Sequence, residues 1–270
     1  MTRTREQLLN HYQVEKELAD KLRKAHPLER PALYGSLYDE LFRRVPDHPR
    51  LTRRDTEQES RRAVTARLGF LKGLLNKDTV FLEIAPGDCR LAFAVAEQVA
   101  KVYAVDISDQ SGGAQRPANF ELVVYDGCRL DFPEKTADVA FSYQFIEHLH
   151  PEDMPGHFAM VHRLLKPGGV YVFDTPHRYS GPHDISREFS TIPEGFHLKE
   201  WTNRELMLVA QQAGFSHAKP GLLKLARLGG ALWAPYLMAE RCLEFVPHRL
   251  RRKLCRRLFA SVALRCYRSK

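Results

Sequence analysis

Short apolar runs and amphipathic stretches alternate through the middle of the chain. Amphipathic stretches with helical spacing fill 89–100 and 153–165. Apolar runs bounded by polar or turn residues occupy 79–85, 101–107, 120–126, 137–143 and 170–176. Short apolar runs that alternate with helices are typical of a parallel β-sheet with helices on both faces. The pattern therefore predicts an α/β core.

The region before this core predicts helices. Residues 1–75 carry mixed charge and few β-branched residues. Pro27 and Pro31 end a first helix, a second is expected over 32–45 and a third over about 56–75. Apolar residues of the first helix stand near helical spacing at Leu8, Tyr12, Val14, Leu18 and Leu22. The second helix carries aromatic residues that either cover a substrate or pack on the sheet, at Tyr34, Tyr38 and Phe42.

The region after the core predicts a helix, an insertion and two strands. A helix over 202–214 begins with Thr202 and Glu205, which fit a capping box. Strands are expected near 216–225 and 261–268, with a mostly helical insertion between them. The chain is thus divided into a helical N-terminal lid or extension (1–75), a core (76–230), a basic helical insertion (231–260) and the final strand of the core (261–270).

The composition is that of a folded globular protein. Apolar residues make up 44% of the 270 residues and charged residues 27%. No run of about 18 apolar residues occurs, so no membrane-spanning helix is predicted, and the start lacks the apolar segment of a secretory signal. The five cysteines are scattered without a C-x-x-C pair, which favours reduced thiols over disulfides or a zinc cluster. We therefore expect a cytoplasmic protein.

The net charge of +8 is concentrated near the C-terminus. From 241 to 270 there are ten Lys/Arg and one acidic residue, Glu244. The mixture of apolar and basic residues in 231–260 fits a helix at an anionic membrane surface, a cover over the substrate or a dimer face. A solvated helix face explains it at least as well. Nucleic acid is not favoured as a partner, because stacking aromatics in a groove-like arrangement are lacking.

The turn after the first core strand is the main candidate for ligand binding. That strand ends at Glu83, and "IAPGDC" follows. Parallel sheets bind ligands at the carboxyl ends of their strands, where backbone N–H groups and a helix N-terminus approach the ligand. Gly87 permits close approach or a positive φ. Asp106 closes the next strand 23 residues after Glu83, a spacing that lets its carboxylate accept both hydroxyls of a ribose.

The same turn does not fit a dinucleotide. It lacks G-x-G-x-x-G, and it carries Glu83 and Asp88, which would repel a pyrophosphate. Carboxylates suit a ligand with an ammonium and a sulfonium instead. A nicotinamide-dependent oxidoreductase is therefore disfavoured.

In these residues the chain resembles the class I S-adenosylmethionine-dependent methyltransferases of the small-molecule type. The resemblance covers about 80–215 and the last strand. Its motifs occur in the family's order: "EIAPGDC", "AVDIS", "VVYDGCRLDFPEKTADVAFSYQFIEHLHPED", "VHRLLKPGGVYVFDTP" and "FHLKEWTNRELMLVAQQAGF". Two features depart from the family pattern. Ala85 and Cys89 stand at the outer positions of its G-x-G-x-G turn, and 108–119 is too rich in glycine for the usual second helix.

The resemblance implies a Rossmann-like, seven-stranded sheet that is mostly parallel and has an antiparallel last strand. It also implies S-adenosylmethionine as the cofactor, with Asp106 as the ribose ligand and Asp126 at the adenine amine. The residues that it places at the cofactor are Glu83, Ala85, Gly87, Asp106, Ile107, Asp126, Gly127 and Tyr143.

Histidines on the loops after the strands are candidates for acceptor chemistry. His148 follows the fourth strand, and His183 and His197 lie in the long loop after the fifth. A neutral histidine can take the proton of an attacking hydroxyl, and His148 is the first choice, although a loop histidine is more often a hydrogen-bonding scaffold. His183, Asp184 and His197 could ligate a metal, but without compact ligand spacing no metal site is predicted.

These patterns together predict an S-adenosylmethionine-dependent methyltransferase. O-methylation of a small-molecule or lipid-like acceptor is favoured, because a helical lid and a long loop suggest an enclosed pocket. An RNA or protein acceptor is the alternative within the enzyme class. The replaced glycines, Ala85 and Cys89, leave a further alternative, a degenerate methyltransferase fold that serves in binding.

Overall fold

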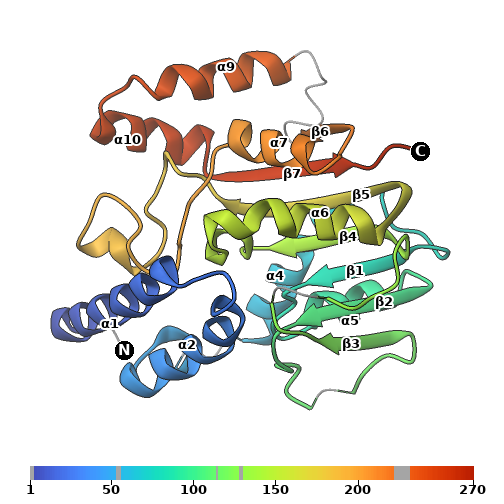
Figure 1. Ribbon diagram of the computed structural model, residues 1–270, viewed down its shortest axis with the longest axis horizontal. Helices are drawn as coiled ribbons and strands as arrows, with labels where there is room; N and C mark the ends of the chain where they lie inside the picture. The colour runs from blue at the N-terminus through green and yellow to red at the C-terminus, as the bar shows by residue number, and fades with distance from the viewer. Residues whose placement is uncertain (1–2, 53–55, 114, 128–129, 222–231) are drawn as a thin grey trace.

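A seven-stranded sheet in the order β3-β2-β1-β4-β5-β7-β6 forms the centre of the computed structural model (Figure 1). The structure describes residues 3–270 apart from 53–55, 114, 128–129 and 222–231. Strands β1 to β5 pair in parallel, and β7 pairs antiparallel to both β5 and β6. The strands are β1 Val80–Ile84, β2 Lys101–Asp106, β3 Phe120–Val124, β4 Ala137–Tyr143, β5 Leu165–Pro176, β6 His217–Pro220 and β7 Ser261–Tyr267. The predicted Rossmann-like fold is confirmed.

Helices cover both faces of the sheet. Phe81 of β1 packs in one buried cluster with Leu91 of α5, and its neighbour Leu82 packs in the other with Phe158 of α6 and Leu206 of α7. Successive residues of a strand point to opposite faces, so β1 carries apolar residues on both faces because each face has its own helical cover; Glu83 is its one charged residue. The helices are α1 Arg5–Lys24, α2 Arg30–Arg44, α3 Pro49–Thr52, α4 Glu57–Phe70, α5 Arg90–Ala96, α6 Met154–Leu164, α7 Asn203–Gln212, α9 Trp233–Leu243 and α10 His248–Leu258, with short 3-10 helices η1 Ile146–His148, η2 Pro151–Asp153 and η3 Ile185–Glu188.

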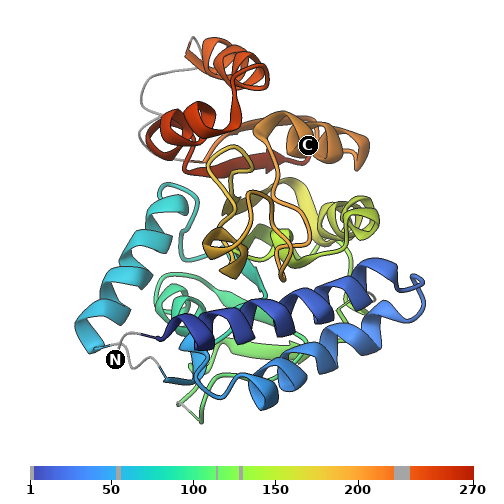
Figure 2. The same ribbon diagram turned by 90° about the vertical axis from the view of Figure 1, so that its left-hand side faces the viewer.

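Helices α1 and α2 lie at the carboxyl ends of the parallel strands (Figures 1 and 2). The backbone N–H of Phe196, in the loop after β5, donates to Glu15 of α1 at 2.8 Å. The backbone N–H of His150, after β4, donates to the Tyr34 hydroxyl of α2 at 2.7 Å. The two helices and this loop share a buried apolar cluster of Val14, Leu18, Ala19, Leu22, Leu37, Leu41, Val45, Phe196 and Leu198. The N-terminal helices therefore cover the edge of the sheet where the sequence predicts ligand binding.

Helices α9 and α10 form the predicted helical insertion between β6 and β7. Glu240 of α9 is 1% exposed, and its Oε1 accepts hydrogen bonds from the backbone and side-chain amides of Asn203, both at 2.8 Å. The same oxygen lies 2.7 Å from Nε2 of His177. One buried carboxylate thus ties α9 to the start of α7 and to the end of β5.

Some element boundaries differ from the predictions. Helix α4 ends at Phe70 and α5 at Ala96, both earlier than the helical pattern suggested. Strand β6 covers His217–Pro220, and the part of its predicted range from 222 onward lies outside the described residues. The capping box of Thr202 and Glu205 is present as predicted. None of the described helices has an apolar stretch long enough to cross a bilayer.

Candidate active site

The turn after β1 has the backbone of a glycine-rich loop. Ala85, Gly87 and Cys89 all have positive φ angles, of 55°, 57° and 58°. For a residue with a Cβ this conformation costs roughly 1–2 kcal/mol, so Ala85 and Cys89 adopt with some strain the shape that glycine adopts freely. Cys89 is buried in the cluster beneath α5, which helps to hold it there. The two replaced glycines therefore leave the form of the turn intact.

Asp106, at the end of β2, is bonded to this turn. Its carboxylate accepts hydrogen bonds from the backbone N–H of Gly87 at 3.2 Å and from that of Ile107 at 2.7 Å. Burial raises the pKa of Asp106, and these N–H groups oppose the rise. The structure thus brings three of the predicted cofactor residues into direct contact.

Glu83 is the last residue but one of β1, which ends at Ile84 and not at Glu83 as predicted. It is 3% exposed, and its Oε2 has no hydrogen-bond partner among the described residues. Burial raises the pKa of Glu83 to about 8; the charge of Arg67 opposes the rise, and those of Asp88 and Asp106 add to it. A buried carboxylate oxygen without a partner is unfavourable, so a cationic ligand at this position would be stabilised. We call Glu83, the turn 84–89 and Asp106 the cofactor face.

Asp126 and Gly127 follow β3 at the same edge of the sheet. Gly127 has a φ of 84°, and a Cβ there would lie 3.3 Å from Ile107 and 3.7 Å from Tyr34 of α2. Gly127 and Ile107 are therefore neighbours beneath α2. Asp126 lies on the surface, unlike Glu83 and Asp106, which are buried.

Tyr143 ends β4, the strand beside β1. The guanidinium of Arg67, from α4, lies 4.7 Å from the centre of its ring. Arg67 therefore reaches both Tyr143 and the neighbourhood of Glu83, whose pKa it lowers. The predictions did not include Arg67, because its helix is charged on most sides and local spacing does not single out one arginine.

A second arginine that the predictions missed approaches from α3. The Arg50 guanidinium lies 5.4 Å from the centre of the Tyr38 ring, and its charge acts on the pKa of Asp106 and of His148. Tyr38 stands one helical turn after Tyr34 on α2. The aromatic residues of α2 thus both pack in the apolar cluster and face the edge of the sheet.

A second group of polar side chains lies beside the cofactor face. Glu147, His148 and His197 each offer one polar atom within 4.8 Å of the other two. The rings of His148 and His197 are 5.1 Å apart and nearly perpendicular. Glu147 is fully buried, its Oε2 accepts from the Thr175 hydroxyl at 2.8 Å, and its Oε1 has no hydrogen-bond partner among the described residues. We call these three residues the histidine face.

The protonation of these groups follows from burial. Burial raises the pKa of Glu147 to about 7 and lowers that of His148 to about 3. His148 is therefore neutral, and its Nδ1 lies 3.0 Å from the carbonyl of Phe196, so Nδ1 carries the proton and Nε2 a lone pair. Burial opposes protonation of His197, but a hydrogen bond from its Nδ1 to Glu200 at 2.9 Å and the charge of Glu147 raise its pKa.

His183 is joined to this group only indirectly. Its backbone N–H donates to Oε1 of Glu200 at 2.7 Å, and its Nε2 lies 2.9 Å from the Ser180 hydroxyl. Burial lowers the pKa of His183. His183 and His197 thus share the Glu200 carboxylate, while His197 also faces His148.

The set His183, Asp184 and His197, considered from the sequence as a metal site, is not the arrangement found. Asp184 accepts from the N–H groups of Ser186 and Gly195 at 3.0 Å each. Among the described residues His197 gathers instead with Glu147 and His148. The signal that could have found this trio is the adjacent pair Glu147–His148 directly after β4.

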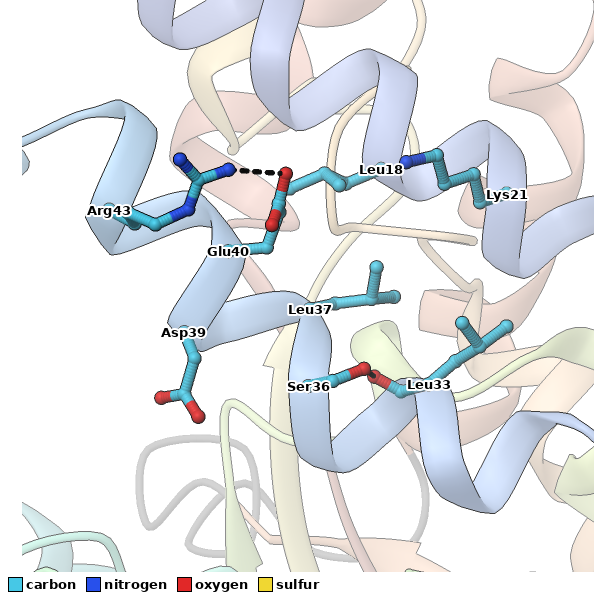
Figure 3. A pocket seen from close by; sticks show the side chains of 8 residues that line it. All are labelled: Leu18, Lys21, Leu33, Ser36, Leu37, Asp39, Glu40 and Arg43. Carbon is cyan, nitrogen blue, oxygen red and sulfur yellow. Dashed lines mark hydrogen bonds and ion pairs between the residues drawn. The ribbon is translucent and has the colours of Figure 1, made fainter.

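Two cavities lie outside the cofactor face. One of about 410 Å³ is formed between α1 and α2 (Figure 3) and shares no residue with the predicted site; its lining includes Leu18, Lys21, Leu33, Leu37 and Glu40. The other, of about 350 Å³, lies between the loop after β5 and α10. Glu200, the partner of His197 and His183, is part of its wall. This second cavity therefore adjoins the histidine face.

Comparison with known proteins finds similarity to methyltransferases. Residues 82–173 match a family model described as a methyltransferase domain. A curated protein of Mycolicibacterium smegmatis, named a "probable S-adenosylmethionine-dependent methyltransferase", is 28% identical over 136 residues, which are 50% of this chain and 51% of that protein. The chain thus spans about half the length of the curated relative that it matches.

Solved structures share the fold at low identity. The Burkholderia thailandensis 1,6-didemethyltoxoflavin-N1-methyltransferase, with bound 1,6-didemethyltoxoflavin and S-adenosylhomocysteine, has a TM-score of 0.55 and 18% identity, with 91% of this chain and 92% of that chain covered. A phosphoethanolamine N-methyltransferase of Haemonchus contortus, in complex with phosphomonomethylethanolamine and S-adenosylhomocysteine, has a TM-score of 0.52 and 17% identity, covering 77% of this chain and 53% of that one. At these identities the likeness shows the fold alone.

Within residues 82–173 the chain is similar to a methyltransferase domain, and its sheet has the fold of the class I S-adenosylmethionine-dependent methyltransferases. S-adenosylmethionine is the cofactor of this domain. The predicted class, fold and cofactor are confirmed.

Proposed function

We propose that the whole protein transfers the methyl group of S-adenosylmethionine to an oxygen of a small-molecule or lipid-like acceptor. The supporting observation is that the cofactor face and the histidine face follow neighbouring strands, β1 and β4, and that Asp106 of one and Glu147 of the other both act on Tyr38 of α2. Residues 1–75 would then act as a lid over the core of 76–230 and 261–270. An enclosed site favours a small acceptor over RNA or protein.

Each part of the cofactor face has a role in this proposal. Asp106 accepts the ribose hydroxyls, exchanging its present hydrogen bonds with the turn for bonds to the ligand. Glu83, buried and short of a partner, faces the ammonium of the methionine part. The backbone of Ala85 and Gly87 lies along the methionine part, and the remaining cofactor contacts are Ile107, Asp126, Gly127 and Tyr143.

The histidines have unequal roles in this proposal. Methyl transfer is an in-line displacement, so the protein chiefly holds the acceptor about 3 Å from the methyl carbon. His197, with its raised pKa, is the stronger base for a hydroxyl proton. His148 stays neutral and presents Nε2 as a hydrogen-bond acceptor. His183 positions Glu200, and through it His197.

The second cavity supports an amphiphilic acceptor. Its wall combines apolar side chains such as Leu198 with more cations than carboxylates: Arg178, Lys199 and Arg251 against Glu200 and Glu244. Such a lining suits a molecule with an apolar body and an anionic group.

Calorimetry and methyl-transfer assays test the proposed function. Wild-type protein should bind S-adenosylmethionine and form S-adenosylhomocysteine only when a hydroxylated small molecule or lipid from a panel is added. Absence of cofactor binding would support the degenerate-fold alternative. Labelling of RNA or protein from methyl-labelled cofactor, with no labelled small molecule, would contradict the acceptor class.

We also propose that α10 binds an anionic membrane surface. Leu250, Leu254 and Leu258 are 53%, 41% and 63% exposed and recur every four residues, so they share one side of the helix. The exposed cations on the same helix include Arg249, Lys253 and Arg256. An exposed apolar row flanked by cations fits the boundary between lipid headgroups and acyl chains.

Vesicle co-sedimentation tests this surface. Wild-type protein should sediment with vesicles of phosphatidylserine and phosphatidylcholine but not with phosphatidylcholine alone. Leu254→Glu should lower the bound fraction several-fold, whereas Leu208→Glu, at a leucine of α7 that is 54% exposed, should not. Equal binding by the two variants would contradict a specific role of α10.

A further inference from the structure

The histidine face has three polar atoms that converge from separate parts of the chain. Glu147 and His148 belong to η1 after β4, and His197 to the loop after β5. Oε1 of Glu147 lies 3.9 Å from Nε2 of His148, too far for a hydrogen bond. The Glu147 side chain is 1% exposed, and this oxygen has no hydrogen-bond partner among the described residues. A buried carboxylate oxygen beside an imidazole lone pair is unfavourable unless a donor or a cation joins them.

Each of the three side chains also has a polar atom that the protein itself holds. These partners are the Thr175 hydroxyl at 2.8 Å from Glu147 Oε2, the Phe196 carbonyl at 3.0 Å from His148 Nδ1 and Glu200 Oε1 at 2.9 Å from His197 Nδ1. Metal-binding histidines almost always donate their second ring N–H to a carboxylate or a backbone carbonyl, which fixes ring orientation and tautomer. Both partner types occur here, one on each histidine.

A second cluster, of His11, Glu15 and His48, has the same residue types, but its hydrogen bonds are made within the protein. Both oxygens of Glu15 are used, one at 2.7 Å from His11 Nε2 and the other by the Phe196 N–H at 2.8 Å. Nδ1 of His11 lies 2.8 Å from the Arg3 guanidinium. His11 and Glu15 thus have no polar atom left for a ligand, and a cation already stands beside His11. This cluster, completed by His48, needs no metal.

We propose that Glu147, His148 and His197 bind a divalent cation of the late first transition row. Two imidazoles and one carboxylate are a ligand set that Zn²⁺ and Fe²⁺ use with open positions left for water or substrate. Ligands about 2.1 Å from a tetrahedral ion lie about 3.4 Å apart, so atoms now within 4.8 Å of one another would need to close by at most about 1.4 Å. This proposal departs from the prediction, made from the sequence, that no metal binds.

The site would also explain how a hydroxyl acceptor becomes reactive, and this step rests on the proposed function. A cation at the histidine face would bind the acceptor oxygen and lower the pKa of its O–H group. With both imidazoles on the cation, His197 would not be the base considered above; the proton would leave to solvent, and an oxygen electron pair would form the new O–CH₃ bond. The pair of the broken S–CH₃ bond stays on sulfur, which gives S-adenosylhomocysteine.

Equilibrium dialysis with Zn²⁺ and visible absorption with Co²⁺ test metal binding on the full chain after chelator treatment. Wild-type protein should bind one equivalent. Glu147→Gln and His148→Ala should each weaken binding by more than about 100-fold, because even loss of an outer partner costs 10–100-fold. His48→Ala, the matched change in the satisfied cluster, should leave binding unchanged. Thr175→Val, which removes only an outer partner, should weaken binding about 10-fold and serves if the other variants do not fold.

The outcomes separate the metal site from the proposed function. No stoichiometric binding by wild type, or binding retained in Glu147→Gln and His148→Ala, would overturn the site. Loss of binding in His48→Ala alone would place the metal at the other cluster and overturn it as well. Metal binding without methyl transfer to any hydroxylated acceptor would contradict O-methylation and leave the site standing. Methyl transfer to a hydroxyl by metal-free protein would support O-methylation and contradict the cation's role in activating the acceptor.

Discussion

The cofactor face and the histidine face adjoin at one edge of the sheet but are assembled differently. The cofactor face comes from one continuous unit, β1, its turn, α5 and β2, and its polar groups bond to one another within 24 residues (83–106). The histidine face joins η1 to a loop residue about 50 positions later and depends on Thr175, Phe196 and Glu200 for its geometry.

The two faces differ in how far apart their residues lie along the chain. A strand–turn–helix–strand unit fixes its own ligand groups, because the end of each strand and the spacing between them are set locally. The loop after β5 is placed instead by α1, through the hydrogen bond from Phe196 to Glu15. Variants of the cofactor face should therefore alter cofactor binding alone, and variants of the histidine face should alter turnover.

The largest effect is expected from Asp106→Ala. Loss of two charge-assisted hydrogen bonds to the ribose should weaken S-adenosylmethionine binding by roughly 100-fold or more, measured by calorimetry. Asp78→Ala is the matched control, since Asp78 is exposed and lies before the start of β1. Equal affinities of the two variants would show that Asp106 does not hold the cofactor.

Glu147→Gln should separate the two faces. The substitution removes the negative charge of the histidine face but keeps the size of the side chain. Turnover should therefore fall by about 10- to 100-fold. The dissociation constant of S-adenosylmethionine should change by less than about threefold, because Glu147 lies outside the cofactor face. A parallel loss of cofactor affinity would mean that the two faces form one binding site.

The buried charge of the cofactor face should appear as a pH dependence of stability. Burial raises the pKa of Glu83 to about 8 from an ordinary value of 4.5. Because the folded state holds this proton more tightly than the unfolded state, protonated Glu83 contributes its full stabilisation below pH 4.5. That stabilisation is lost as the pH rises through 8. The melting temperature of cofactor-free protein should therefore fall between pH 5 and 8 more steeply in wild type than in Glu83→Gln. In the control Glu97→Gln, at an exposed residue, the melting temperature should change with pH as in wild type. The same dependence on pH in all three proteins would show that Glu83 is not buried as described.

The smallest effect is expected in the turn itself. Ala85 has a φ of 55°, so Ala85→Gly removes backbone strain of roughly 1 kcal/mol while it adds chain entropy to the unfolded state. Chemical denaturation should show an unchanged or slightly higher free energy of unfolding. Ala94→Gly, inside helix α5, should lower it by about 1 kcal/mol. If both variants lost a comparable free energy of unfolding, the backbone at Ala85 would not be strained as described.

Much of the cofactor face could be predicted from the sequence, and little of the histidine face. Glu83, Gly87 and Asp106 were predicted because apolar runs locate strand ends and strand ends of a parallel sheet meet at one edge. Their roles in cofactor binding remain predictions. Arg50 and Arg67 were missed, because the N-terminal helices carry many arginines and only their packing decides which ones face the sheet.

The sequence by itself determined the layered α/β fold and the turn, since hydrophobic period and turn residues act over short distances. Tertiary structure alone decided that His197 would meet His148 rather than Asp184, and that Glu147 would be buried without a full set of partners. The physical reason is that a loop has no period of its own. Its side chains take their directions from the helix and strand against which the loop packs.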